Sequence, residues 1–232
     1  MRLLKKLIFI IVLLIAALLG LVTKQGYDMY LEAINEISIE EKVAEIKQKE
    51  NYTEYSELPE NYINAVIAVE DKSFRLHKGV NPISIARAIF IDIKEMSFEE
   101  GGSTITQQLA KNIYFTQEKK ITRKVAEIFM AIDIEKVCSK EEIFELYVNT
   151  SYFGDGYYCV KDASQGYFDK DPIDMDLYEC TLLAGIPNAP SVYAPTKNPE
   201  LSRQRQAQVV RKMLKQGYLT QEEADTVILV SE

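Results

Sequence analysis

The sequence predicts a mainly α-helical domain that follows one membrane-spanning helix. Residues 7–22 form an uncharged apolar run near the N-terminus. After residue 58, helix start and stop signals recur, whereas β alternation and hairpin dipeptides are not prominent. A chain of 232 residues with 47% hydrophobic content is long enough for one well-buried domain and hardly for two.

The apolar run is sixteen residues long, at the short edge of the roughly 17–25 residues of a spanning helix. A cleaved secretory signal peptide is therefore the alternative, but no convincing small-x-small cleavage site follows. Arg2, Lys5 and Lys6 precede the run, which predicts that the N-terminus stays in the cytoplasm and the rest is exported. We expect residues 1–25 to be a cytoplasmic tip and a transmembrane signal anchor.

The rest of the chain divides into two expected parts. Residues 26–57 mix charges with spaced apolar residues and predict a juxtamembrane stalk without chemistry of its own. Residues 58–232 form the predicted domain, which begins where proline suits the first turn of a helix. Local signals for its helix ends are the capping-box spacings of Ser139 with Glu142 and Thr220 with Glu223, and the stop at Gly217.

Cysteine usage and net charge limit the class of protein. The three cysteines Cys138, Cys159 and Cys180 show no metal-ligand spacing, and His77 is the single histidine, which argues against a zinc site. We expect buried apolar fillers, with one disulfide as the alternative. A net charge of −8 argues against a nucleic-acid partner and leaves room for a local basic patch that binds phosphates.

The first polar run, residues 68–79, contains Glu70 and Asp71 at the end of a strongly apolar segment. On a helix from about residue 60, Glu70 shares a face with Ile63 and Ile67. A carboxylate at the edge of an apolar face loses hydration and becomes a better proton acceptor near neutral pH. The alternative is an ordinary solvated acidic helix end.

The second polar run, residues 101–112, begins with two glycines that let the backbone approach a ligand closely. Ser103 or Thr104 can cap the following helix, whose free N–H groups favour an anion. Further along the helix, residues four apart share a face and offer amides to sugar hydroxyls and an ammonium to phosphate: Gln107 with Lys111, and Gln108 with Asn112. A capped, solvated helix without a ligand is the alternative.

The third run places Arg123, Lys124 and Glu127 on one helical turn, after Lys119 and Lys120. Taken alone, Arg123 and Glu127 could form a surface ion pair worth about 0.3 kcal/mol.

These three runs, in this order and with the later blocks 140–149 and 182–193, resemble the peptidoglycan glycosyltransferases. This family is the transglycosylase module of bifunctional penicillin-binding proteins and also occurs as a monofunctional enzyme. The resemblance extends from about residue 58 to the C-terminus. It implies the lysozyme-like glycosyltransferase fold, here with an N-terminal transmembrane helix.

The resemblance also implies roles for individual residues. Glu70 would be the general base that deprotonates the 4-hydroxyl of the acceptor sugar, and Glu127 a second essential carboxylate that orients groups or assists a cation. Many relatives carry arginine where Lys119 stands, and lysine keeps the charge but loses bidentate geometry. His77 is expected to be a hydrogen-bonded structural residue. The residues implied to bind substrate are Asp71, Arg87, Ser103, Thr104, Gln107, Gln108, Lys111, Lys119, Arg123, Lys124 and Asn149.

The implied activity is the polymerisation of lipid II into glycan strands, with inversion at the anomeric carbon and release of undecaprenyl pyrophosphate. No nucleotide cofactor is implied, and the use of a divalent cation, Mg²⁺ or Mn²⁺, stays open, with no metal ligands assigned. A non-catalytic scaffold of a cell-wall synthesis complex and a murein-cleaving enzyme of similar fold are the alternatives.

The expected location is the cell membrane, crossed once, with the catalytic domain outside the cytoplasm. Expected partners are lipid II, the lipid-linked glycan chain, the membrane, transpeptidases and other cell-wall synthesis proteins, with no nucleic acid. No serine-x-x-lysine motif follows the last block, so we expect another protein to perform cross-linking.

Overall fold

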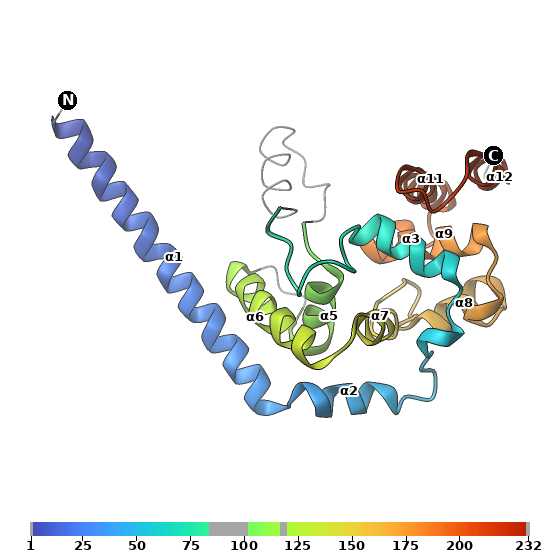
Figure 1. The fold of residues 1–232 in the computed structure, drawn as a ribbon, viewed down its shortest axis with the longest axis horizontal. Coiled ribbons are helices and arrows are strands. Elements are labelled where there is room, and N and C mark those ends of the chain that lie inside the picture. The colour runs from blue at the N-terminus through green and yellow to red at the C-terminus, as the bar shows by residue number, and fades with distance from the viewer. Residues whose placement is uncertain (1, 84–101, 117–119, 231–232) are drawn as a thin grey trace.

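The computed structural model describes residues 2–83, 102–116 and 120–230, and all regular elements in these ranges are helices (Figure 1). This confirms the predicted mainly α-helical class with an N-terminal apolar helix. The α-helices and 3₁₀-helices, in chain order, are α1 (Arg2–Glu36), α2 (Ile39–Lys47), η1 (Tyr55–Glu57), α3 (Glu60–Glu70), α5 (Ile105–Tyr114), α6 (Ile121–Val137), α7 (Lys140–Val148), α8 (Val160–Phe168), η2 (Pro172–Asp174), α9 (Leu177–Gly185), η3 (Ile186–Asn188), α10 (Pro190–Tyr193), α11 (Pro199–Lys215) and α12 (Gln221–Val230).

Local capping chemistry sets several of the helix ends. Thr220 and Glu223 form the predicted reciprocal pair at the start of α12. At α7 only half of the predicted box forms: Ser139 accepts the Glu142 N–H, while the Glu142 carboxylate pairs with Lys47 of α2. Gly217 follows α11 with a φ of 78°, a left-handed conformation that suits glycine and ends the helix.

The core surrounds α3, which is buried from Tyr62 to Val69. This helix packs against α9 and α11 on one side of the domain, and α5 packs against α6 and α7 on the other. Large fully buried side chains fill the space between the helices, among them Tyr62, Phe144, Tyr147 and Phe153. Glu70 is the C-terminal residue of this helix and is partly exposed, whereas the eight residues before it are buried.

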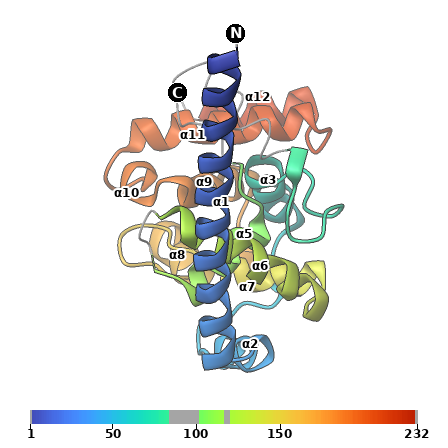
Figure 2. The same cartoon turned by 90° about the vertical axis from the view of Figure 1, so that its left-hand side faces the viewer.

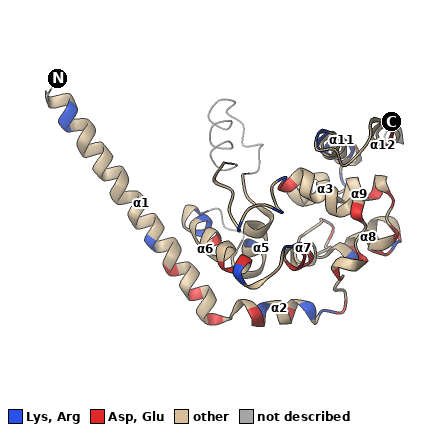
Figure 3. Ribbon diagram, viewed as in Figure 1, with Lys and Arg blue, Asp and Glu red and all other residues tan. Residues whose placement is uncertain are grey.

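Helix α1 is continuous from Arg2 to Glu36 and extends far beyond the apolar run. Its N-terminal part stands away from the domain and is free of charged residues between Lys6 and Lys24 (Figure 3). The helix is long and apolar enough to cross a membrane, with a mean hydropathy of 2.8 in an 18-residue window that is 0% buried. Its C-terminal part lies against α6 (Figures 1 and 2).

The segment predicted as a stalk is packed onto the domain at both ends. Residues 26–36 of α1 lie on α6, and α2 contacts α6 further along. Beyond α2, the side chain of Asn51 donates to Asp162, Tyr52 donates to Glu145, and the backbone of Thr53 is bonded to Asn149. This segment therefore belongs to the packed structure as well as linking α1 to it.

The three cysteines are free and buried, as the filler interpretation predicts, and the disulfide alternative is wrong. Burial raises the pKa of Cys138 to about 12, of Cys159 to about 11 and of Cys180 to about 12. The thiolate is the reactive form, so all three thiols are held unreactive at neutral pH.

We expect alkylation of the folded protein by iodoacetamide at pH 8 to be at least about 100-fold slower than alkylation of free cysteine, whose pKa is about 8.5. The rate is measured by mass spectrometry. In urea, all three thiols should react at the rate of free cysteine. Rapid labelling of any thiol in the folded protein would contradict the burial of these side chains.

Candidate functional site

A pocket of about 240 Å³ opens where the three polar runs meet. It lies between the C-terminus of α3, the helices α5 and α6, and the 3₁₀-helix η3. Its lining residues are Glu70, Ser103, Gln108, Lys111, Arg123, Lys124, Glu127, Pro187 and Asn188. All of these except Pro187 and Asn188 are predicted site residues.

Glu70 is the last residue of α3, and its side chain is 7% exposed. Its Oε2 accepts a hydrogen bond of 2.7 Å from Gln108 Nε2. Its Oε1 is buried and has no hydrogen-bond partner among the described residues, although a guanidinium nitrogen of Arg205 lies 3.5 Å away. One carboxylate oxygen is thus anchored, and the other keeps unused hydrogen-bonding capacity beside the Arg205 guanidinium.

Two polar side chains of α11 hold the backbone just before Glu70. Lys212 Nζ donates to the Val69 carbonyl at 3.1 Å, and Gln216 Nε2 donates to the Ala68 carbonyl at 3.0 Å. These carbonyls belong to the last turn of α3, where intrahelical partners run out. The hydrogen bonds from α11 therefore fix the end of the helix that carries the carboxylate.

Arg205 was not identified from the sequence. It is 8% exposed on α11, where its Nε donates to the Gly185 carbonyl at 3.3 Å and one terminal nitrogen donates to Gln208 at 3.0 Å. A signal was present, because Arg205 shares its helix face with the apolar Val209 one turn later. Its other terminal nitrogen lies 3.5 Å from Glu70 Oε1, so a buried guanidinium stands beside the carboxylate.

Helices α5 and α6 contribute three cations to the pocket lining, Lys111, Arg123 and Lys124, which together are called the cation group. Arg123 pairs with one oxygen of Glu127 at 2.5 Å, and Lys124 pairs with the other at 2.8 Å. Lys124 also donates to Ser103 Oγ at 2.7 Å. Glu127 is 1% exposed, so the interpretation of this cluster as a surface ion pair is wrong.

Lys111 differs from the other two cations because its ammonium group has no hydrogen bond or ion pair to any described residue. Burial lowers the pKa of Lys111 from its ordinary value of 10.5, and the neighbouring Arg123 and Lys124 act in the same direction against the attraction of Glu127 and Glu70. A half-buried ammonium that lines a pocket and has no partner among the described residues is a strong attractor of an anionic ligand.

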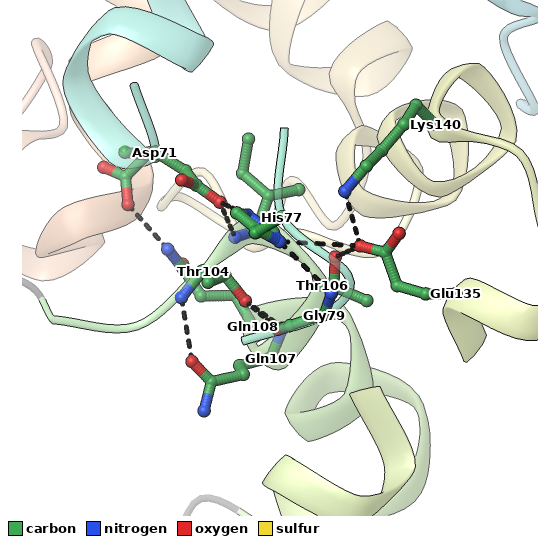
Figure 4. A network of polar contacts seen from close by, with 11 residues as sticks. Asp71, His77, Gly79, Thr104, Thr106, Gln107, Gln108, Glu135 and Lys140 are labelled. Atoms are coloured by element: carbon green, nitrogen blue, oxygen red, sulfur yellow. Dashed lines mark hydrogen bonds and ion pairs between the residues drawn. The ribbon is translucent and has the colours of Figure 1, made fainter. Parts of the chain in front are cut away.

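Behind the pocket, a polar network joins the loop after α3 to the start of α5 (Figure 4). Asp71 Oδ2 accepts from the Ile105 N–H at 3.1 Å and contacts His77 Nε2 at 2.6 Å. The Gly79 N–H donates to His77 Nδ1 at 3.1 Å, so Nδ1 is the acceptor and Nε2 carries the proton. This confirms His77 as a hydrogen-bonded structural residue.

The network also holds the start of α5 through its capping residues. Thr104 Oγ1 donates to the Gly79 carbonyl at 2.6 Å and accepts the Gln107 N–H at 3.1 Å, while Gln107 Oε1 accepts the Thr104 N–H. One turn on, Thr106 donates to Glu135, which also pairs with Lys140 (Figure 4). These bonds orient α5 so that Gln108 and Lys111 face the pocket.

The structure therefore separates the predicted substrate-binding residues into two groups. Asp71, Thr104, Gln107 and Asn149 are buried and do not line the pocket. Asn149 instead joins the end of α7 to the segment before η1: its amide donates to the Thr53 carbonyl at 2.8 Å and its oxygen accepts the Thr53 N–H at 2.9 Å. Arg87 and Lys119 lie outside the described residues.

Together, the pocket groups can accept a proton from a hydroxyl at Glu70 and stabilise negative charge at the cation group. The lining residues carry three cationic and two acidic side chains, so the pocket is net positive although the chain has a net charge of −8. Fold and site thus define a helical protein with a carboxylate base candidate and a cationic wall that suits an anionic substrate.

A family model described as transglycosylase matches residues 38–214, which is most of the chain. The chain belongs to the transglycosylase family. The match includes every described pocket residue, and it begins in the segment that precedes α3.

Several relatives of this chain are much longer proteins. Penicillin-binding protein 1A of Aquifex aeolicus is 42% identical over 181 residues, which cover 78% of this chain and 25% of that protein. Penicillin-binding protein 1F of Bacillus subtilis is 43% identical over 171 residues, or 74% of this chain and 24% of that protein. Penicillin-binding protein 1A of Vibrio cholerae is 46% identical over 169 residues, which cover 73% of this chain and 20% of that protein. The chain spans about a quarter of the length of these relatives or less.

A crystal structure of penicillin-binding protein 1A from Haemophilus influenzae has 30% sequence identity and a TM-score of 0.38, over 53% of this chain and 15% of that one.

We expect Asn149→Ala to lower the free energy of unfolding by about 2 kcal/mol, because it leaves the buried N–H and carbonyl of Thr53 without partners. Urea denaturation followed by circular dichroism measures the effect. Asn61→Ala on the exposed face of α3 is the matched control and should be nearly neutral. Unchanged stability together with lost substrate binding in Asn149→Ala would instead support the substrate-binding role predicted from the sequence.

Proposed function

We propose that this protein is a membrane-anchored peptidoglycan glycosyltransferase that polymerises lipid II into glycan strands. The observation that carries the proposal is the unused hydrogen-bonding capacity of Glu70 Oε1 across one pocket from the ammonium of Lys111, which has no partner among the described residues. Membership of the transglycosylase family and identities of 42–46% to penicillin-binding proteins 1A and 1F support the same activity.

In the proposed reaction, Glu70 takes the proton of the 4-hydroxyl on the N-acetylglucosamine of the acceptor lipid II. That oxygen attacks C1 of the N-acetylmuramic acid at the lipid-linked end of the growing chain. The bond from C1 to the pyrophosphate oxygen breaks, the α-linkage becomes a β-linkage, and undecaprenyl pyrophosphate leaves. Gln108 holds the other oxygen of Glu70, so the carboxylate keeps its orientation during proton transfer.

Negative charge develops on the leaving pyrophosphate, and the cation group would stabilise it. Lys111 provides an ammonium without a competing partner among the described residues, while Arg123 and Lys124 are oriented by Glu127. Preorganised charges of this kind need no rearrangement as the transition state forms. Lys119, predicted from the sequence as a further cation, lies outside the described residues.

The described pocket residues fit a resident metal ion poorly. Both oxygens of Glu127 are taken by Arg123 and Lys124, and Glu70 is held by Gln108. No group of three or more potential metal ligands gathers among the described residues. We derive no step through a metal; Mg²⁺ or Mn²⁺ that arrives with the substrate pyrophosphate is the open part of this proposal, and assays with and without EDTA test it.

The proposed orientation follows from α1, with the basic N-terminus in the cytoplasm and the pocket outside the membrane. In this arrangement the substrate never leaves the bilayer, and the anchor restricts the search for it to two dimensions. Transpeptidases and other cell-wall synthesis proteins are the expected protein partners.

We expect Glu70→Gln to reduce polymerisation of labelled lipid II at least about 100-fold, because the amide keeps the shape and loses the basicity. Products are resolved by gel and identified by their sensitivity to muramidase. Glu60→Gln at the exposed start of α3 is the matched control and should retain full activity. Turnover close to wild type in Glu70→Gln would refute the assignment of the base.

The same assay separates the alternatives. Folded wild-type protein that yields no polymer under varied conditions would support a scaffold. Shortening of a preformed glycan by the wild type would support a murein-cleaving enzyme.

The lowered pKa of Lys111 predicts a pH dependence. The ammonium loses its proton and its attraction for pyrophosphate as pH rises through the lowered pKa, so polymerisation should decline at a pH below 10.5. Lys111→Arg keeps the charge at high pH and should move this decline upward, whatever its effect on the maximal rate. Lys215→Arg, at an exposed position near the end of α11, is the control. Superimposable pH profiles of wild type and Lys111→Arg would show that Lys111 does not control the alkaline limb.

A further inference from the structure

Helices α1 and α6 approach each other closely at Gly26, which is buried. A Cβ atom at this position would lie 2.5 Å from Val125 Cβ and 2.7 Å from the Thr122 carbonyl oxygen. Only glycine allows this approach, so the contact defines which turn of α1 faces which turn of α6. By contrast, Gly20 of the same helix has nothing within 4 Å.

Aromatic and polar contacts continue from Gly26 along the same face of α1. Tyr27 packs edge-on against Phe129 with ring centroids 5.0 Å apart, and Tyr30 lies 5.8 Å from the same ring. The Tyr30 hydroxyl donates a hydrogen bond to Asp133. Because α1 has no break between the apolar run and these contacts, its membrane part and its docked part move as one rod.

The opposite face of α6 belongs to the pocket. Thr122 and Val125, which contact Gly26, flank Arg123 and Lys124 of the cation group in the sequence. The contact with the anchor and the cationic wall therefore occupy the same turn of one helix. A shift of α1 along α6 would change the height of the cation group relative to the anchor.

The number of residues between the apolar run and Gly26 relates this contact to a depth in the membrane. Gly26 lies four residues after Val22, the end of the apolar run, which corresponds to about 6 Å of helix. The headgroup layer on each side of a bilayer is roughly 5–8 Å thick. The apolar run itself is only about 24 Å long, less than the hydrocarbon thickness of about 30 Å, so it has no surplus length along which to slide.

We propose that the packing of Gly26 against Thr122 and Val125 sets the height of the cation group at the level of the lipid headgroups. Helix α1 is then a positioning element of the site as well as an anchor, and Gly26 is a positioning residue. This inference rests on the proposed function, because a pyrophosphate joined to a membrane lipid is the ligand whose depth would match.

An insertion in α1 changes the height of the cation group above the membrane without disturbing the contact between α1 and α6. The sequence Glu-Lys-Gln-Gln placed between Lys24 and Gln25 adds about 6 Å of helix between the apolar run and Gly26 and leaves the α1–α6 interface intact. In proteoliposomes, we expect the KM for lipid II to rise at least about tenfold. In detergent micelles, which adapt to the protein, the KM should stay close to that of the wild type. The same four residues inserted after Arg2 lengthen the cytoplasmic end only and serve as the matched control.

A second readout measures depth directly and does not depend on activity. The chain contains no tryptophan, so Ile121→Trp at the exposed start of α6 provides a single fluorescent reporter. Quenchers attached at the level of the lipid headgroups should quench this reporter strongly, and the insertion after Lys24 should weaken the quenching.

Substitution of Gly26, the residue of α1 that contacts α6, gives a third test. Gly26→Leu should separate α1 from α6, weaken the quenching and raise the KM in proteoliposomes. Gly20→Leu, in open space on the same helix, should change neither.

The outcomes distinguish this inference from the proposed function. Unchanged quenching and unchanged KM after the insertion, in a wild type that polymerises lipid II, would overturn the inference and leave the proposed function standing. Weakened quenching in a protein that never polymerises lipid II would support the depth setting and remove the proposed function.

Discussion

The hydrogen bond from the Ile105 N–H to the Asp71 carboxylate joins the two helices on which the pocket depends. The N–H groups at the start of a helix have no intrahelical partner, and a buried carboxylate is stable only when its oxygens are hydrogen-bonded. Asp71 and the start of α5 satisfy each other, and His77 completes the arrangement. On either side of this junction lie Glu70 and Gln108, so the same hydrogen bonds that close the core also bring the base candidate to its amide partner.

Helix α6 connects two parts of the molecule with opposite chemistry. Its outer face is aromatic and apolar where it meets α1, and its inner face holds Glu127 between Arg123 and Lys124. A buried carboxylate requires such pairing, since an unpaired buried charge is strongly destabilising. The pairing also limits the movement of both cations, which places two of the three positive charges of the pocket on a rigid helix that is packed against the anchor.

Much of the site could be predicted because its three runs are compact in the sequence. Glu70, Gln108, Lys111, Arg123, Lys124 and Glu127 all line one pocket, as the resemblance of these runs to the family implied. Asp71, Thr104, Gln107 and Asn149 have the same polar character, yet their side chains bond the backbone or a buried histidine. Residue type alone does not distinguish these two uses, because the partner of each buried group comes from a distant part of the chain. Arg205 and Asn188 were missed for the same reason, since their neighbours at the pocket lie far away in the sequence.

The sequence by itself determined the properties that arise within a few consecutive residues. These are the apolar length of α1, the helical class, several of the helix ends and the composition of the polar runs, all of which depend on local hydrogen bonding and periodicity. The tertiary structure decided which oxygen of Glu70 stays available, which cation has no partner among the described residues and where α1 rests on α6. These features depend on desolvation and on close packing between distant segments, and such interactions exist only once the chain has folded.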